Sequence, residues 1–142
     1  MTKLRSTDVL QHGHNLTHLF CLLLDFLTEI LEKHDCPMTT RPSILISAEE
    51  VFINIASYAY PNQHGDVTIT VSFMNDPSRI AVTFADSGIP YNPLMNAEPD
   101  TTLDAENREI GGLGIFLVRT RMDDVTYEFR ENQNLLTFIK QF

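Results

Sequence analysis

Basic residues are scarce in this sequence. The 142 residues include ten Lys and Arg against nineteen Asp and Glu, which gives a formal net charge of -9. Such an excess of negative charge repels phosphate backbones and anionic lipid surfaces over most of the protein. The composition therefore argues against direct nucleic-acid binding and against a membrane surface as a partner.

Cysteines and long apolar runs are also few. The two cysteines, Cys21 and Cys36, have no CxxC spacing and no second pair, so they predict neither a zinc site nor a disulfide framework and fit a reducing compartment. The longest apolar run, Leu19–Leu24, is followed by Asp25, whereas a membrane-spanning helix needs about 20 apolar residues. The N-terminal stretch has no apolar segment of the signal-peptide kind. We therefore expect a cytoplasmic protein.

The size and the apolar content predict one domain over residues 1–142. Hydrophobic residues make up 43% of the chain and aromatic residues 9%. This is enough to build a substantial core in a chain of this length.

Apolar periodicity predicts the order of helices and strands. Apolar side chains at three- and four-residue steps indicate a first helix from Leu16 to about His34, and a second helix capped by Ser43 and ended by Pro61. Alternating apolar runs around turn residues predict two hairpins. Their strands are Val67–Phe73 with Arg79–Phe84, and Val125–Phe129 with Asn134–Phe142. No strand is evident in the opening residues "MTKLRSTDVL".

A first chemical motif lies in the second predicted helix. Glu50 and Asn54 are four residues apart, so both side chains project from the same side of the helix. Mg²⁺ prefers oxygen ligands and usually keeps several waters, so one Asn carbonyl together with substrate phosphates is enough to hold it. The same pattern is common on solvated helix faces, so this motif is informative only in combination with others.

A second motif, "DSGIP", directly follows a predicted strand. Asp86 at this position is able to accept a hydrogen bond from an exocyclic amine, and Gly88 lets the chain turn where a side chain would block a flat ring. A turn that merely ends a strand uses the same residue types, so this motif alone leaves both interpretations open.

A third motif is the glycine cluster in "EIGGLGIFLVRTRMDDV", which precedes an apolar, helix-like run. It lacks the Lys-Ser/Thr of a P-loop, and Leu117 stands where the third glycine of GxGxxG would be, so neither common nucleotide fingerprint applies. Glycines at a helix start nevertheless expose backbone N–H groups, which bind anions together with the helix dipole. Phosphate binding is thus compatible with an acidic protein.

In this order, the three motifs resemble the nucleotide-binding (Bergerat) domain of the GHKL ATPase superfamily, and within it the bacterial anti-sigma-factor serine kinases. Residues 49–61 are similar to the N box, 86–90 to the G1 box and 111–125 to the G2 box, with the polar stretch 91–110 as the ATP lid. The resemblance implies an α/β two-layer sandwich, with helices on one face of a mixed, largely antiparallel sheet.

The resemblance also implies a role for each motif residue, with ATP and Mg²⁺ as cofactors. Asn54 would ligate Mg²⁺, Glu50 would be the general base that acts on the attacking hydroxyl, and Asp86 would bind the adenine amine. The other nucleotide-binding positions would be Gly88 beside the ring, Gly111, Gly112, Leu113 and Gly114 around the phosphates, and Thr137, which would support the adenine through water.

The implied function is an ATP-dependent serine/threonine protein kinase that acts on a small partner protein. The partner would be an anti-anti-sigma-like substrate, a sigma factor or both, and the resemblance also allows a homodimer. Two other functions stay open: a non-catalytic module in which ATP only sets the lid conformation, and a detached histidine-kinase-like ATPase domain. The segment "MDDVTY" is more similar to the anti-sigma branch than to histidine kinases.

Overall fold

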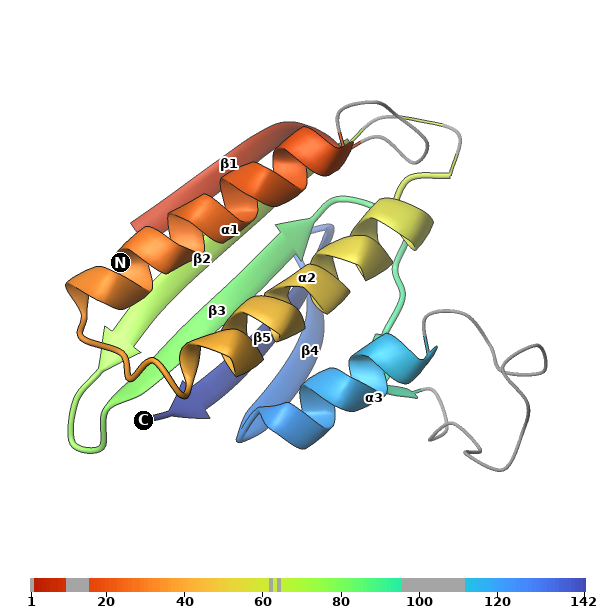
Figure 1. Cartoon of the computed structure of the whole chain (residues 1–142). Helices are drawn as coiled ribbons and strands as arrows, with labels where there is room; N and C mark the ends of the chain where they lie inside the picture. The colour runs from red at the N-terminus through yellow and green to blue at the C-terminus, as the bar shows by residue number, and fades with distance from the viewer. Residues whose placement is uncertain (1, 10–15, 62, 64, 96–111) are drawn as a thin grey trace.

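Helices and pairs of strands follow one another along the chain after a first single strand in this structure, a computed structural model that describes residues 2–9, 16–61, 63, 65–95 and 112–142 (Figure 1). The elements in chain order are β1 (Thr2–Val9), α1 (Leu16–Lys33), α2 (Arg41–Tyr58), β2 (Gly65–Met74), β3 (Arg79–Asp86), the 3-10 helix η1 (Pro93–Met95), α3 (Gly112–Arg121), β4 (Asp124–Arg130) and β5 (Gln133–Gln141). Both predicted hairpins and all three predicted helices are present.

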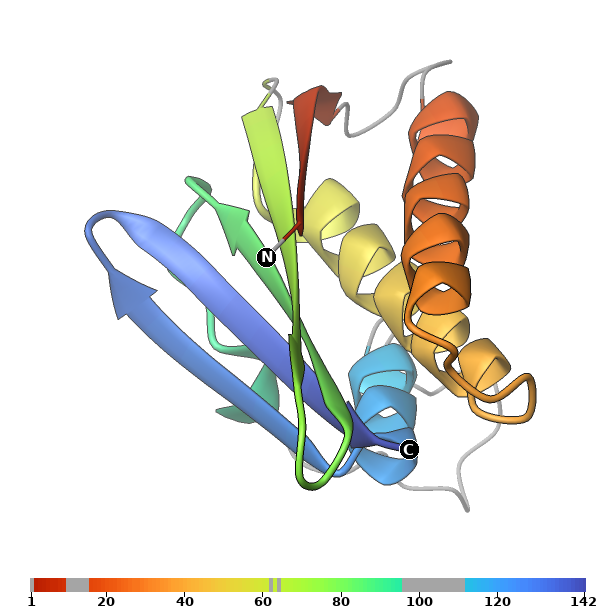
Figure 2. The same ribbon diagram turned by 90° about the vertical axis from the view of Figure 1, so that its left-hand side faces the viewer.

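The strands form one five-stranded sheet in the order β1-β2-β3-β5-β4. Each neighbouring pair among these described strands is antiparallel. The three helices lie on one face of the sheet, as the two perpendicular views show (Figures 1 and 2). The predicted α/β two-layer sandwich is therefore confirmed, with the difference that the sheet, predicted to be mixed and largely antiparallel, is antiparallel throughout its described strands.

The strand β1 is an element that the sequence did not reveal. It pairs with β2, from Thr2 opposite Val71 to Val9 opposite Gly65, with an irregularity after Ser6. Its sequence, TKLRSTDV, is mostly polar and lacks the apolar alternation that identifies a half-buried strand. As an edge strand it pairs with β2 through backbone hydrogen bonds, which composition does not report.

The helix α2 begins two residues before its predicted cap. Its first residue is Arg41 and its N-cap is Thr40, whereas Ser43 was the expected cap. Pro42 lies in the first turn, where its missing N–H is not needed for an intrahelical hydrogen bond. The helix therefore accommodates a proline in its first turn, before the expected cap.

The core lies between the helices and the inner face of the sheet. Alternate side chains of β3 and β5 are buried, as expected of strands that have one face against helices. Phe52 of α2, Phe84 of β3 and Phe138 of β5 are among the largest fully buried side chains. This packing fixes α2 across the sheet and brings its polar side chains to the end of β3.

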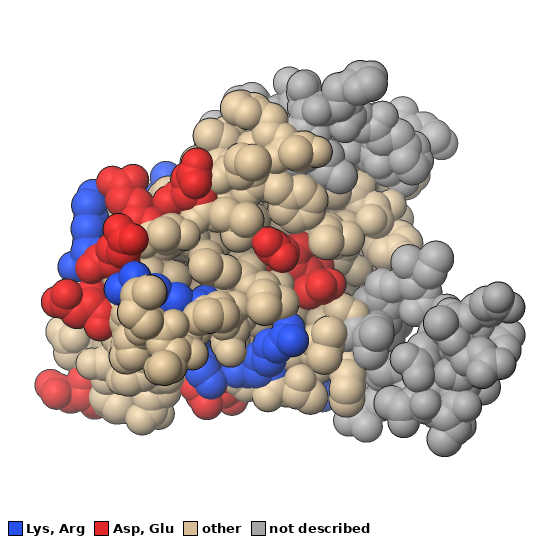
Figure 3. All heavy atoms as spheres, viewed as in Figure 1, with Lys and Arg blue, Asp and Glu red and all other residues tan. Residues whose placement is uncertain are grey.

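The structure locates the charged side chains and the two cysteines. Acidic and basic groups are interspersed on the helix-covered face rather than gathered into one basic surface (Figure 3). Cys21 is exposed and Cys36 is buried, and both are free thiols. Across the ranges that the structure describes, no helix has the length and apolarity needed to cross a membrane.

Candidate functional site

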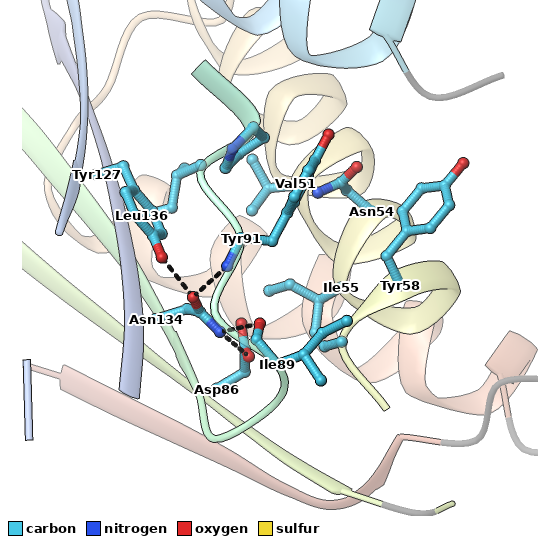
Figure 4. Close-up of a pocket in the computed structure, with 12 residues that line it drawn as sticks. Val51, Asn54, Ile55, Tyr58, Asp86, Ile89, Tyr91, Tyr127, Asn134 and Leu136 are labelled. Carbon is cyan, nitrogen blue, oxygen red and sulfur yellow. Dashed lines mark hydrogen bonds between the residues drawn. The ribbon is translucent and has the colours of Figure 1, made fainter. Parts of the chain in front are cut away.

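A pocket opens between α2, the segment that follows β3, and the β4–β5 hairpin (Figure 4). Its empty space, counted together with the solvent at its open mouth, is about 400 Å³. Its walls are mainly apolar and aromatic, formed by Val51, Ile55, Leu136, Tyr58, Tyr91 and Tyr127 among others. Its polar side chains are Asn54, Asp86 and Asn134. This is the composition expected of a pocket for a flat, partly polar ligand.

Asp86, the last residue of β3, is a buried carboxylate of this pocket with 5% of its surface exposed. Its Oδ1 accepts the backbone N–H of Gly88 at 3.0 Å and Nδ2 of Asn134 at 2.9 Å. Oδ2 accepts no hydrogen bond from the part of the chain that the structure describes. Burial raises the pKa of Asp86, and the two hydrogen bonds offset part of that rise. One carboxylate oxygen is thus held by the protein and the other remains for a ligand.

Asn134 is a pocket residue that the sequence analysis missed. It lies directly opposite Asp86 in the β3–β5 pairing, and it is 7% exposed. Its amide also contacts Tyr91, where the predicted lid begins, and Tyr127 of β4. The available signal was a polar residue at an inward-facing position of an otherwise apolar strand.

Thr137 does not lie opposite Asp86 in the sheet, and the support of the adenine through water that the resemblance implies for it stays a prediction. It pairs with Thr83 in the sheet, and the two hydroxyl oxygens are 2.8 Å apart. Successive strand residues face opposite sides of a sheet, so Thr137, three residues from Asn134, lies on the face away from the helices. Asn134 occupies the position beside Asp86 instead.

Gly88 packs directly against the end of α2. A side-chain carbon at this position would overlap the carbonyl oxygen and Cβ of Ala59. The same carbonyl accepts the N–H of Ile89 at 3.0 Å. The absence of a side chain at Gly88 therefore lets the segment after β3 lie against α2 and form one wall of the pocket.

Gly88→Ala is expected to destabilise the protein by roughly 1–3 kcal/mol, because the new methyl group meets backbone atoms that cannot move independently of α2. Denaturant unfolding followed by circular dichroism measures this. The control is Ser87→Ala, since Ser87 is an exposed neighbour. Equal unfolding free energies of wild type and Gly88→Ala would contradict the close packing of Gly88 against Ala59.

Tyr60 also holds the segment that follows β3, through hydrogen bonds of its hydroxyl group. Its hydroxyl donates to the carbonyl oxygen of Asp66 at 2.6 Å and accepts the backbone N–H of Ser87 at 2.8 Å. Burial raises the pKa of this phenol. The residue directly after Asp86 is therefore tied both to the end of α2 and to the start of β2.

Glu50 lies one helical turn before Asn54, at the contact between α2 and α3. A side-chain carbon on Gly114 would overlap Oε2 of Glu50, so the carboxylate lies against the first turn of α3. Gly112 is the first residue of α3 and Leu113 the second, so their backbone N–H groups belong to a helix N-terminus. Gly111 and residues 96–110 of the predicted lid are outside the described residues.

The structure therefore brings two of the predicted residues, Asn54 and Asp86, into one pocket, with Glu50 and Gly114 in contact next to it. Within the described ranges, no group of three or more His, Cys, Asp or Glu side chains is arranged to hold a metal ion. A cation here would depend on the Asn54 carbonyl and on oxygens of a ligand.

Comparisons with known proteins agree with this geometry. The family model of the histidine kinase-like ATPase domain matches residues 16–140. The serine-protein kinase RsbW of Listeria monocytogenes is 30% identical over 95 residues, which cover 64% of this chain and 60% of that protein. RsbW of Bacillus cereus is 30% identical over 95 residues, 64% of this chain and 58% of that protein. The serine/threonine-protein kinase BtrW of Bordetella bronchiseptica is 27% identical over 97 residues, 68% of each chain. The match thus spans less than two thirds of the length of the two RsbW proteins.

Proposed function

Because this chain belongs to the family of histidine kinase-like ATPase domains, we propose that it binds ATP with Mg²⁺ in the pocket beside α2 and phosphorylates a serine or threonine of a protein partner. The observation that supports this best is the buried Asp86, which has one oxygen held by the protein and one left for a ligand. In this proposal residues 1–142 act as one ATP-binding domain.

Adenine is the proposed occupant of the apolar part of the pocket. Its exocyclic amine donates to Oδ2 of Asp86, while its ring lies against the segment that Gly88 brings close to α2. The apolar and aromatic walls suit a flat base, since few polar groups there would lose water without gaining a partner.

The phosphates are proposed to extend from the pocket toward the start of α3. Backbone N–H groups of Gly112, Leu113 and Gly114, together with Gly111 and the lid at 91–110, would enclose them, and the helix dipole adds to this binding. Asn54 would hold Mg²⁺, which neutralises charge on the phosphates.

Glu50 is the proposed general base. The hydroxyl oxygen of the partner attacks the terminal phosphorus, the bond from that phosphorus to the oxygen of departing ADP breaks, and Glu50 accepts the hydroxyl proton. Its carboxylate lies against the first turn of α3, beside the proposed phosphate position. Positioning and charge neutralisation supply most of the catalysis in such transfers.

The proposed partner is a small protein of the anti-anti-sigma kind, with a sigma factor as a second binding partner. The sequence motifs that resemble anti-sigma-factor kinases support this, as do relatives named serine-protein kinases. In this proposal the protein acts in the cytoplasm, and it also forms a homodimer.

Incubation with labelled ATP and candidate partners, followed by acid and base treatment, tests this function. An acid-stable label on serine or threonine of the partner is expected. An acid-labile label would point to a histidine-kinase-like activity instead. Partner binding that depends on ATP, with no transfer of label, would support the non-catalytic ATP-sensing module.

Asn54→Ala is expected to abolish the increase in ATP affinity that Mg²⁺ produces, because the carbonyl proposed as the only protein ligand is removed. Calorimetric titrations with ATP, in the presence of Mg²⁺ and in the presence of a chelator, measure the effect. Ile53→Ala, an exposed neighbour on α2, is the matched control. A Mg²⁺ effect that survives in Asn54→Ala would assign the ligand elsewhere.

A further inference from the structure

The buried amide of Asn134 has a partner at each of its hydrogen-bonding positions. Nδ2 donates to Oδ1 of Asp86 at 2.9 Å and to the carbonyl oxygen of Ile89 at 3.0 Å. Oδ1 accepts the backbone N–H of Tyr91 at 3.1 Å and the hydroxyl of Tyr127. A side-chain amide offers two donors and two acceptor positions, so the side chain is fully satisfied.

These partners fix the orientation of the Asn134 amide. The ionised carboxylate of Asp86 and the carbonyl of Ile89 only accept hydrogen bonds, so the amino group must face them. The backbone N–H of Tyr91 only donates, so the oxygen must face it. Aspartate at this position would set a second carboxylate against Asp86, and leucine would make none of these bonds.

We propose that Asn134 is a positioning residue for nucleotide binding, which holds Asp86 by one oxygen so that the other remains free for the adenine amine. Its side-chain oxygen also accepts the backbone N–H of Tyr91, the first residue of the predicted lid, so the start of the lid is held beside Asp86. The inference rests on the proposed ATP site, because it assigns the adenine to Asp86.

The role predicts a particular dependence on pH. Because Oδ1 of Asp86 accepts two hydrogen bonds, a proton taken up by this carboxyl would lie on Oδ2, where it would face the adenine amine; the ionised form therefore binds the amine better. Burial raises the pKa of Asp86. The hydrogen bond from Asn134 lowers that pKa again, so loss of this bond should raise it further. The ionisable groups on which the charge of Asp86 acts are Tyr60, just after α2, and Tyr127 of β4. Burial raises the pKa of both phenols, so both stay neutral from acidic to neutral pH.

The test is the affinity for ADP, measured by calorimetry from mildly acidic to neutral pH in wild type and Asn134→Ala. The variant is expected to bind roughly tenfold more weakly at neutral pH, because the Asp86 carboxylate is no longer held in the orientation that the adenine amine requires. Its loss of binding on acidification should also begin at higher pH than in the wild type. Titration of the nucleotide itself is common to both proteins and cancels in the comparison.

Two control variants distinguish a positioning role of Asn134 from a general disturbance of the folded structure. Thr126→Val removes an exposed polar group from the neighbouring strand β4, so the wild-type curve is expected. Tyr127→Phe removes one hydrogen bond to Asn134 but leaves the bond from Asn134 to Asp86, so the acid midpoint should stay in place. If Asn134→Ala does not fold, Asn134→Ser is measured in the same way.

Two outcomes would overturn the inference. The first is a loss of affinity in Asn134→Ala that is equal at every pH, with an unchanged midpoint. The second is measured without ligand, by NMR titration of the Asp86 carboxyl carbon. It is an Asp86 pKa that has the same value in wild type and in Asn134→Ala. A wild type that binds no nucleotide would overturn the proposed function instead, and the NMR titration would still decide whether Asn134 acts on Asp86.

Discussion

Glu50→Gln is expected to slow phosphoryl transfer to the partner by roughly 100- to 10,000-fold, the contribution typical of acid–base catalysis, while ATP still binds. Glutamine keeps the length and the hydrogen-bonding reach of the side chain but cannot take a proton. The Glu50 carboxylate contacts the first turn of α3 and is not among the residues that line the pocket proposed for adenine. Glu50→Gln should therefore lower the rate of phosphoryl transfer without a matching loss of ATP affinity.

The matched control is Glu49→Gln, which removes the same charge from the preceding residue of α2. Neighbouring helical residues point about 100° apart, so Glu49 cannot reach the same place. Single-turnover transfer rates and ATP dissociation constants should be measured on one partner for all three proteins. Equal rates in wild type and Glu50→Gln would eliminate Glu50 as the base, and an inactive wild type would favour the ATP-sensing module.

Asp86→Asn is expected to weaken ATP binding by about 10- to 100-fold, because an acceptor with full negative charge is replaced at the adenine amine. The hydrogen bonds that Gly88 and Asn134 donate require oxygen at the Oδ1 position. The new amide must therefore turn its NH₂ group toward the ligand, where it faces another donor. Calorimetry with ATP and with ADP measures the loss, and Asp124→Asn, an exposed change on β4, serves as the control.

The same substitution should leave the free energy of unfolding unchanged or raise it at neutral pH. Because burial raises the pKa of Asp86 in the folded protein, the folded state favours the protonated carboxyl. That contribution to stability is complete below the unfolded pKa and is lost as pH rises through the folded pKa. Asparagine carries no charge and avoids this loss. A marked destabilisation of Asp86→Asn at neutral pH would contradict this account of the site.

Much of the fold was predictable because its signals are local. The apolar period of α1 and α2, and the turn residues between the strands of both hairpins, identify elements without any knowledge of their neighbours. The order of the motifs then predicted that Asn54 of α2 and Asp86 of β3 would serve one site, and the structure brings both into one pocket.

The site residues that could not be predicted depend on contacts between segments that are distant in the sequence, such as the pairing of β3 with β5. Asn134 and Thr137 lie on the same strand, and a choice between them as the neighbour of Asp86 requires the β3–β5 register. Their separation is an odd number of residues, so one faces the helices and the other faces away. Tyr60 was missed for a similar reason, because its contacts with Asp66 and Ser87 join segments that only the folded chain brings together.

The pocket is assembled from α2, the segment after β3, and the β4–β5 hairpin, which are far apart in the chain. An unfolded chain therefore has no part of the site that could bind a nucleotide by itself, and ligand affinity adds directly to the stability of the whole domain. A nucleotide present at 100 times its dissociation constant would contribute about 2.7 kcal/mol. Because typical domains are stable by only about 5–15 kcal/mol, the lifetime of this protein against unfolding and proteolysis should follow the nucleotide concentration around it.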